Sequence, residues 1–451
     1  MLITPAFLHQ IKNCYDIRST KFSNDDALLF GKAFGSELIE YGKKRAVIGY
    51  DRRRYSKQIH DFFIEGLLST GVDVISIGPA TTPMVQIAEF ELETDASISV
   101  TASHNPPEYQ GLKLFLDKHS FADINLAKLG QRILDENFKI GFGKLEFRNF
   151  NFQYAELLEK KLTPLGNVKI AWDFVNGSSA EIFPYLTKLF KGSHYILNHE
   201  YDPNFGGFAP DPTFEPRLEE LKNLIKDKNL DFGIALDGDS DRCIVIDKHG
   251  KIVPGDNLSA LFGYLTHKIE NRNIKMIWDS KSSSVLIKWA RSFAQSATCV
   301  TGHSNLYNAL RNTDSDIACE TSGHYMFKDH YGVNDGFFSA FKLINYLKQI
   351  NLSLEEALNL LPTKWTFDPA PIKCSQEDKE HVIRQIANIL QKQGITMDLS
   401  DGVKACYSYG WWMVRPSRTE EILRISAEGW TEESLEDIKD HMHAVISSIA
   451  L

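Results

Sequence analysis

The sequence lacks the features that mark membrane, zinc-binding and disulfide-rich proteins. No apolar run approaches the roughly 20 residues that span a bilayer, and the first residues have neither the basic nor the apolar segment of a signal peptide. The 451 residues include 6 cysteines, and no two of them have C-x-x-C spacing, which disfavours zinc sites and disulfide frameworks. The cysteines are Cys14, Cys243, Cys299, Cys319, Cys374 and Cys406. We therefore expect a cytoplasmic protein without a membrane partner.

An excess of basic residues is also missing. The formal net charge is −9, and Lys and Arg are scattered along the chain. A nucleic-acid surface needs a basic face, so we expect no nucleic-acid partner. An anionic ligand remains compatible with this charge, because a phosphate needs only a local basic cluster.

Two sets of similar strands indicate a repeat of about a hundred residues. Residues 46–51, 169–173 and 275–279 each read as a short buried strand that ends at an aromatic–Asp pair. Residues 95–103, 231–237 and 316–320 each begin with Asp, run apolar and end in a polar loop. The alternative is that any α/β protein offers several similar strands. A repeat of this length suits a domain, and ligands of α/β sheets bind beyond the carboxyl ends of strands.

The length of the chain and its breaks predict four domains. Breaks fall near 145–155 and 250–255 and at the Pro-rich stretch near 365–372. Beyond the last break we expect a helix near 376–393, strands from 402 and 411, and a helix from 432. The predicted fold class is α/β, with three similar α/β domains around a central cleft and a smaller α+β C-terminal domain. The predicted boundaries are 1–148, 149–252, 253–367 and 368–451.

The first polar loop, residues 101–107, presents a serine. Ser103 follows a strand and precedes a turn that two prolines fix, and we expect this turn to expose the hydroxyl. The G-x-S-x-G pattern of serine hydrolases is absent. Lys113 and Arg18 are basic residues that could balance a phosphate. An ordinary turn serine that caps the next helix is the alternative.

The second polar loop, residues 237–242, carries three carboxylates. Asp237, Asp239 and Asp241 alternate after a strand, which suits a hard divalent cation. The loop is not an EF-hand, because Arg242 and Lys248 replace the required Gly and Glu. A solvated acidic turn is the alternative, but three neighbouring aspartates repel one another without a cation. The favoured ion is Mg²⁺, with a phosphate oxygen as a further ligand.

Two further segments carry polar side chains suited to a phosphosugar. Residues 320–324, Glu-Thr-Ser-Gly-His, can accept and donate hydrogen bonds to sugar hydroxyls. Residues 415–420, Arg-Pro-Ser-Arg-Thr-Glu, suit a phosphate. Ordinary capped turns are the alternative for both segments.

Together these motifs resemble the α-D-phosphohexomutase superfamily, and most closely its bacterial phosphomannomutase/phosphoglucomutase branch. The resemblance covers nearly the whole chain. It rests on the ordered motifs YDIR, D-x-R, TASHNPP-x-Y-x-G-x-K, DGDSDR, a lysine at a strand end, G-H, E-x-S-G-H and R-P-S-x-T-E. Cys319 and Arg418 depart from the family pattern in substrate loops, which leaves the preferred sugar open.

The resemblance implies a role for each motif. It implies Ser103 as the phosphoserine, which joins Asp237, Asp239 and Asp241 around Mg²⁺. The residues implied around the transferring phosphoryl group are Arg18, His104, Lys113 and Arg242. The residues implied for substrate binding are Lys281, Glu320, Ser322 and His324, with Arg415, Ser417 and Thr419 as the clamp on the non-reacting phosphate. His303 matches a residue of the same cleft. Lys113, His303 and His104 are open candidates for the general base.

The implied activity interconverts hexose 1-phosphate and hexose 6-phosphate, of mannose or glucose, through a hexose 1,6-bisphosphate. The alternative sugar is glucosamine phosphate. A phosphatase of the haloacid-dehalogenase type would use Asp237 and Asp239 but leaves Ser103 unexplained. A non-catalytic sugar-phosphate binding protein would not need the serine and the aspartates. We expect a monomer.

Overall fold

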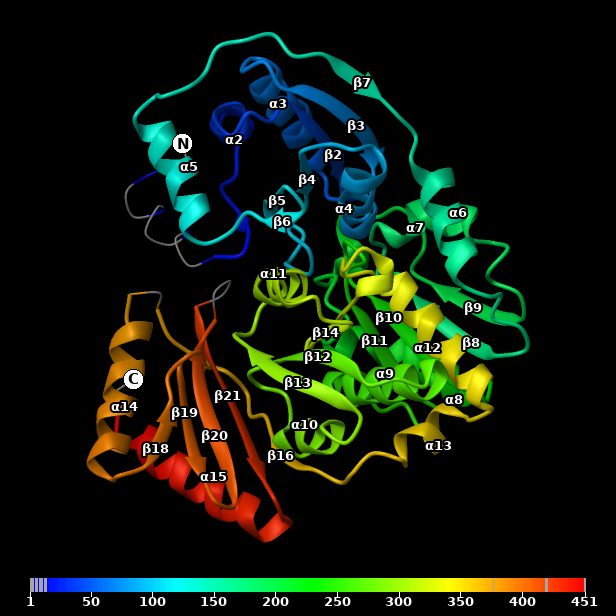
Figure 1. Ribbon diagram of the computed structural model, residues 1–451, viewed down its shortest axis with the longest axis vertical. Helices are drawn as coiled ribbons and strands as arrows, with labels where there is room; N and C mark the ends of the chain where they lie inside the picture. Colours follow the sequence, from blue (N-terminus) through cyan, green and yellow to red (C-terminus); the bar gives the residue numbers. More distant parts are fainter. Residues whose placement is uncertain are drawn as a thin grey trace.

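Three successive parts of the chain form sheets of matching topology, and a fourth sheet forms at the C-terminal end (Figure 1). The structure is a computed structural model, and it describes residues 4, 7, 11, 14–375, 377–417 and 421–449. Among the helices in these ranges, none combines the length and the apolar character that crossing a membrane requires.

The first unit has a sheet of order β1-β5-β4-β2-β3-β7, with β6 paired to β5. Its elements are β1 (Ile17–Ser19), α2 (Asn24–Glu40), β2 (Arg45–Tyr50), α3 (Ser56–Leu68), β3 (Asp73–Pro79), α4 (Thr82–Glu91), β4 (Ala96–Val100), β5 (Gln110–Leu116), β6 (His119–Ser120), α5 (Ile124–Leu134) and β7 (Leu145–Phe147).

The second unit has the strand order β11-β10-β8-β9. Its elements are α6 (Asn151–Lys161), β8 (Lys169–Asp173), α7 (Ser179–Ile182), η1 (Phe183–Tyr185), β9 (Ser193–Leu197), η2 (Phe205–Gly207), η3 (Glu215–Leu218), α8 (Glu219–Asp227), β10 (Phe232–Leu236) and β11 (Cys243–Asp247).

The third unit has the order β13-β12-β14-β15. Its elements are α9 (Gly255–Glu270), β12 (Ile274–Asp279), α10 (Ser284–Ala290), β13 (Ala294–Cys299), α11 (His303–Thr313), β14 (Ile317–Glu320), β15 (His324–Phe327), η4 (Lys328–His330), α12 (Gly336–Ile350) and α13 (Leu354–Leu358).

The strand pairing confirms the repeat that the sequence predicted. Strands β2, β8 and β12 pair in parallel with β4, β10 and β14, respectively. Each of the latter pairs antiparallel with the next strand, β5, β11 or β15. The carboxyl ends of the two parallel strands therefore share one edge in each sheet, and the three polar loops begin at these edges. The fold class is confirmed, and the exact domain boundaries stay predictions.

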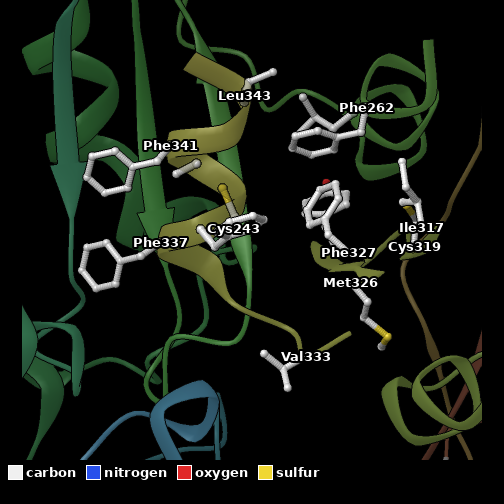
Figure 2. Close-up of a cluster of buried hydrophobic side chains, with 14 of the residues drawn as sticks. Cys243, Phe262, Ile317, Cys319, Met326, Phe327, Val333, Phe337, Phe341 and Leu343 are labelled. Carbon is white, nitrogen blue, oxygen red and sulfur yellow. The ribbon is translucent and has the colours of Figure 1, made fainter. Parts of the chain in front are cut away.

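Helix α12 joins the second and third units into one hydrophobic core. Its residues are apolar around most of its circumference, as expected of a buried helix. The rings of Phe337 and Phe341 pack on the second unit, and the Phe341 centroid lies 5.7 Å from that of Trp172. Phe338 packs on Phe327 of the third unit at 5.6 Å. Figure 2 shows Phe337 and Phe341 on one side of this helix and Phe262 and Phe327 on the other.

The C-terminal unit has its own core and the sheet order β16-β21-β20-β19-β18, with β17 paired to β21. Its elements are β16 (Trp365–Phe367), β17 (Ile372–Lys373), α14 (Lys379–Lys392), β18 (Thr396–Asp398), β19 (Val403–Tyr407), β20 (Gly410–Pro416), β21 (Ile422–Gly429) and α15 (Glu432–Ser447). Helices α14 and α15 contact the sheet and each other. The elements predicted beyond residue 372 are thus confirmed.

Candidate active site

Ser103 lies in the turn after β4, and its hydroxyl faces the aspartate loop. The Ser103 Oγ donates to Asp237 Oδ2 at 3.0 Å and lies 3.3 Å from His104 Nδ1. The sequence predicted an exposed hydroxyl, which is wrong, because Ser103 is only 1% exposed. The aspartate loop of the second unit covers the turn so closely that a Cβ at Gly238 would lie 2.6 Å from Ser103 O.

The three aspartates of the second loop are buried together. One carboxylate oxygen from each of Asp237, Asp239 and Asp241 lies within 4.8 Å of the others. Burial and the two neighbouring carboxylates raise the pKa of Asp237 well above its usual range. A cation would remove this repulsion.

The donor set fits a hard divalent cation, since such ions favour carboxylate oxygens. Asp239 Oδ1 is buried and accepts no hydrogen bond from the described residues, so it is available as a ligand. Lys113 Nζ lies 2.6 Å from both Asp239 Oδ2 and Asp241 Oδ2. Burial lowers the pKa of Lys113, but these two carboxylates outweigh burial and raise it overall.

Other predicted residues surround the serine and the aspartates. Arg18 donates to both oxygens of Asp16, at 3.0 and 2.7 Å, and to Asn105 Oδ1 at 2.6 Å. Arg242 Nε lies 3.6 Å from Asp237 Oδ2. Burial, Arg242 and Arg18 hold the pKa of His104 well below its usual range, so this imidazole is neutral at pH 7.

The sugar loop predicted at residues 320–324 contacts the aspartate loop directly. His324 Nε2 lies 3.2 Å from Asp241 Oδ1, and His324 Nδ1 lies 2.9 Å from Ser322 Oγ and 3.4 Å from Glu320 Oε2. The ring of His303, at the start of α11, stacks at 5.7 Å on His324. Burial and the Lys113 charge lower the pKa of His303 to about 4.

A cleft of about 520 Å³ brings most of the predicted residues together. Of the site residues predicted from the sequence, those that line this cleft are Arg18, His104, Arg242, Lys281, His303, Glu320, Ser322, His324, Arg415 and Ser417. Ser103, Lys113 and the three aspartates are buried next to these lining residues. Thr419 and Arg418 lie outside the described residues.

Three residues at the site were not predicted. Arg424 lines the cleft and is the cross-strand partner of Arg415; this pairing depends on the register of β20 and β21. Thr82, at the start of α4, donates through Oγ1 to Asp239 Oδ2 at 2.6 Å. Arg53 contacts the serine loop. It belongs to the D-x-R motif, for which no role was predicted from the sequence.

Comparison with known proteins agrees with this geometry. Sequence models of the phosphoglucomutase/phosphomannomutase family match four consecutive parts of the chain. The alpha/beta/alpha domains I, II and III match residues 9–138, 148–250 and 254–365, and the C-terminal domain matches residues 372–445.

Relatives are similar over almost their full length. A phosphomannomutase/phosphoglucomutase of Pseudomonas aeruginosa is 30% identical over 99% of this chain and 98% of its own. A phosphoglucomutase/phosphomannomutase of Thermococcus kodakarensis is 30% identical over 92% of this chain and 93% of its own. A probable phosphoglucosamine mutase of Methanococcoides burtonii is 30% identical over 91% of this chain and 93% of its own.

A solved structure shows the same architecture. A phosphoglucomutase/phosphomannomutase family protein from Burkholderia thailandensis superposes with a TM-score of 0.88 at 27% identity, and the match covers 97% of each chain. The ordered motifs, the repeated sheets and these similarities together show that the chain belongs to the phosphoglucomutase/phosphomannomutase family of the α-D-phosphohexomutase superfamily.

Proposed function

We propose that the protein is a phosphohexomutase that moves a phosphoryl group between O1 and O6 of a hexose phosphate. The observation that carries this proposal is the Ser103 Oγ hydrogen-bonded to one of three clustered buried aspartates, beside a cleft that also holds Arg415. A serine that is phosphorylated here would have an acidic metal site on one side and basic side chains on the other.

The reaction has two phosphoryl transfers. In the first, the bond from phosphorus to Ser103 Oγ breaks while a bond to the free sugar hydroxyl forms, which gives a hexose 1,6-bisphosphate. The hydroxyl proton leaves to a base, and a proton is later supplied to Ser103 Oγ. After the bisphosphate has turned over, the reverse transfer restores phosphoserine 103 and leaves the isomeric monophosphate. Positioning and charge neutralisation supply most of the rate enhancement in such transfers.

Asp237, Asp239 and Asp241 would hold Mg²⁺, together with an oxygen of phosphoserine 103. The ion supplies positive charge that neutralises the transferring phosphoryl group. Arg18 and Arg242, which both line the cleft, add further positive charge, and an arginine fork suits phosphate oxygens.

Of the three candidates for the general base, the two histidines fit better than the lysine. Lys113 Nζ lies 2.6 Å from carboxylate oxygens of Asp239 and Asp241, which favour its ammonium form, and an ammonium has no lone pair to accept a proton. His303 and His104 both have lowered pKa values, so each is a neutral imidazole at pH 7 and can accept the hydroxyl proton.

The substrate groups away from the transfer would lie against Glu320, Ser322, His324 and Lys281, while Arg415, Ser417 and Thr419 clamp the distal phosphate. Pro369 and Pro371 line the same cleft and lie between β16 and β17, which both pair with β21 of the C-terminal sheet. The C-terminal unit has its own core, which suits a unit that closes over the substrate. Mannose and glucose phosphates are the proposed substrates, and glucosamine phosphate is the alternative. We propose that the enzyme is a monomer.

The test compares the wild type with Ser103→Ala in coupled assays on mannose 1-phosphate, glucose 1-phosphate and glucosamine 1-phosphate, each with a trace of bisphosphate. Ser69→Ala is the matched control, because this hydroxyl bonds only the Gly66 carbonyl among the described residues. We expect intact-mass measurement to show one phosphate on the wild type and the control and none on Ser103→Ala, which should be inactive. An active Ser103→Ala would refute the phosphoserine, and release of inorganic phosphate without isomerised product would indicate a phosphatase.

A further inference from the structure

Arg53 is buried against the backbone of the serine loop, and it is not among the described residues that line the cleft. We propose that Arg53 is a positioning residue that holds Ser103 in the backbone conformation needed for phosphoryl transfer. This inference rests on the proposed function.

Every N–H of the Arg53 guanidinium has an acceptor. Nη2 donates to Ser103 O at 2.7 Å and to Asn105 O at 2.6 Å. Nη1 donates to Pro106 O at 2.6 Å and to Tyr109 O at 3.2 Å, and Nε donates to Asp51 Oδ2 at 3.1 Å. A guanidinium carries five N–H donors, so none is left for a phosphate. Arg53 therefore acts on Ser103 through the loop.

The conformation that these bonds hold is strained. Ser103 has a φ of 51°, a left-handed value that residues with a Cβ adopt only where surrounding contacts enforce it. Arg53 binds the carbonyl of Ser103, while the N–H of Ser103 donates to Thr101 Oγ1 at 2.9 Å. Thr101 Oγ1 in turn donates to Asp51 Oδ2 at 2.7 Å. The Asp51–Arg53 pair thus restrains both peptide groups of Ser103.

The third unit of the internal repeat uses the matching position differently. Arg53 stands two residues after Asp51, at the end of β2, and Lys281 stands two residues after Asp279, at the end of the equivalent β12. Lys281 Nζ is 3.8 Å from Asp279 Oδ2 and lines the cleft. Arginine can bridge several carbonyls with its planar fork, whereas lysine offers three donors on one atom.

The second unit closes the other side of Arg53. The guanidinium lies over the ring of Phe205 at 5.1 Å, and Phe205 is fully buried. The neighbouring Arg54 differs from Arg53. It is exposed, contacts Asn204 Oδ1 at 3.3 Å and makes no hydrogen bond to the described part of the serine loop. Arg53 is thus enclosed between the loop and the second unit, where its orientation is fixed.

The experiment measures the Arg53→Lys variant, with Arg54→Lys as matched control. The readouts are kcat, KM, and the rate at which hexose 1,6-bisphosphate phosphorylates the dephosphorylated enzyme, followed by intact mass. A displacement of about 1 Å in a reacting group costs on the order of 100-fold in rate. We therefore expect Arg53→Lys to lose about 100-fold in kcat and in phosphorylation rate while KM changes less than about threefold. Arg54→Lys should match the wild type.

Arg53→Ala with added guanidinium at a non-denaturing concentration should recover part of the lost rate, and Thr101→Val should give the same split between kcat and KM. Thr101→Val also tests the proposal if the Arg53 variants fail to fold. A wild-type kcat in Arg53→Lys would overturn the positioning role. If the Arg53 variants do not fold, a wild-type kcat in Thr101→Val would overturn it instead. A rise in KM with an unchanged phosphorylation rate would also overturn it. A wild type that is never phosphorylated on Ser103 would instead refute the proposed function.

Discussion

Replacement of Glu428 by alanine should loosen the C-terminal unit and raise KM for the sugar phosphate. Glu428 lies on β21 and is completely buried. Its carboxylate accepts from Trp411 Nε1 within its own sheet at 2.7 Å. It also accepts from Ser284 N at 2.8 Å and from Ser283 Oγ, both at the start of α10 in the third unit. One buried carboxylate therefore joins the proposed phosphate clamp to the unit that carries the sugar loop.

The magnitude follows from the two hydrogen bonds that Glu428 itself accepts from the third unit. A hydrogen bond to a charged acceptor contributes about 1.5–3 kcal/mol. We take the lower value for each, because Ser283 and Ser284 regain water when the units part, which gives about 3 kcal/mol for the pair. This free energy corresponds to a shift of about 150-fold in the docking equilibrium. If only the docked state binds both ends of the substrate, KM rises by up to this factor while kcat at saturation stays unchanged.

Steady-state kinetics and small-angle scattering of the free enzyme test this prediction together. Glu428→Ala should show a larger KM and a larger radius of gyration, and saturating substrate should restore the compact form. The exposed Glu433, in the first turn of α15, provides the control Glu433→Ala, which should leave both quantities unchanged. An unchanged KM together with an unchanged radius would refute the idea that Glu428 holds the two units together.

Four further changes test other parts of the site and fold. Asp239→Asn replaces an anionic metal ligand with a neutral oxygen, so calorimetry should show at least about tenfold weaker Mg²⁺ binding; unchanged affinity would argue against the metal site. Glu320→Gln should lower kcat on mannose and glucose 1-phosphates while Ser103 is still phosphorylated, and wild-type kinetics on both sugars would refute its role. Arg415→Ala should raise KM and release more bisphosphate in a single turnover; normal binding without extra release would refute the clamp. Burial raises the pKa of the Glu89 carboxyl from 4.5 to about 7. The folded state therefore binds the carboxyl proton more tightly than the unfolded state. As a result, the free energy of unfolding falls by up to about 3 kcal/mol as pH rises from about 4.5 through 7. In thermal denaturation, Glu89→Gln should therefore lose less stability than the wild type between about pH 5 and pH 8, and an equal loss in both proteins would contradict this.

The repeat and the loops that carry the proposed chemistry could be predicted from the sequence. Strands ending in an aromatic–Asp pair recur because each unit builds the same parallel pair of strands, and local apolar patterns are enough to find them. The three aspartates after β10 were equally readable, since their spacing along one loop already brings the carboxylates together. The motifs also indicated the family, which the comparisons confirmed.

How these loops meet depends on packing between distant parts of the chain and could not be predicted from the sequence. The sequence predicted an exposed Ser103, but the hydroxyl is buried because a loop from another unit, more than a hundred residues later in the chain, packs over it. The contacts of Lys113 with Asp239 and Asp241, and of Arg53 with the serine loop, depend likewise on side-chain orientation and on packing between or within units. Arg53 and Lys281 occupy matching positions in the repeat, yet one faces a backbone loop and the other the cleft. Which way such a side chain turns is set by the acceptors and the space around it, and these come from parts of the chain that only folding brings together.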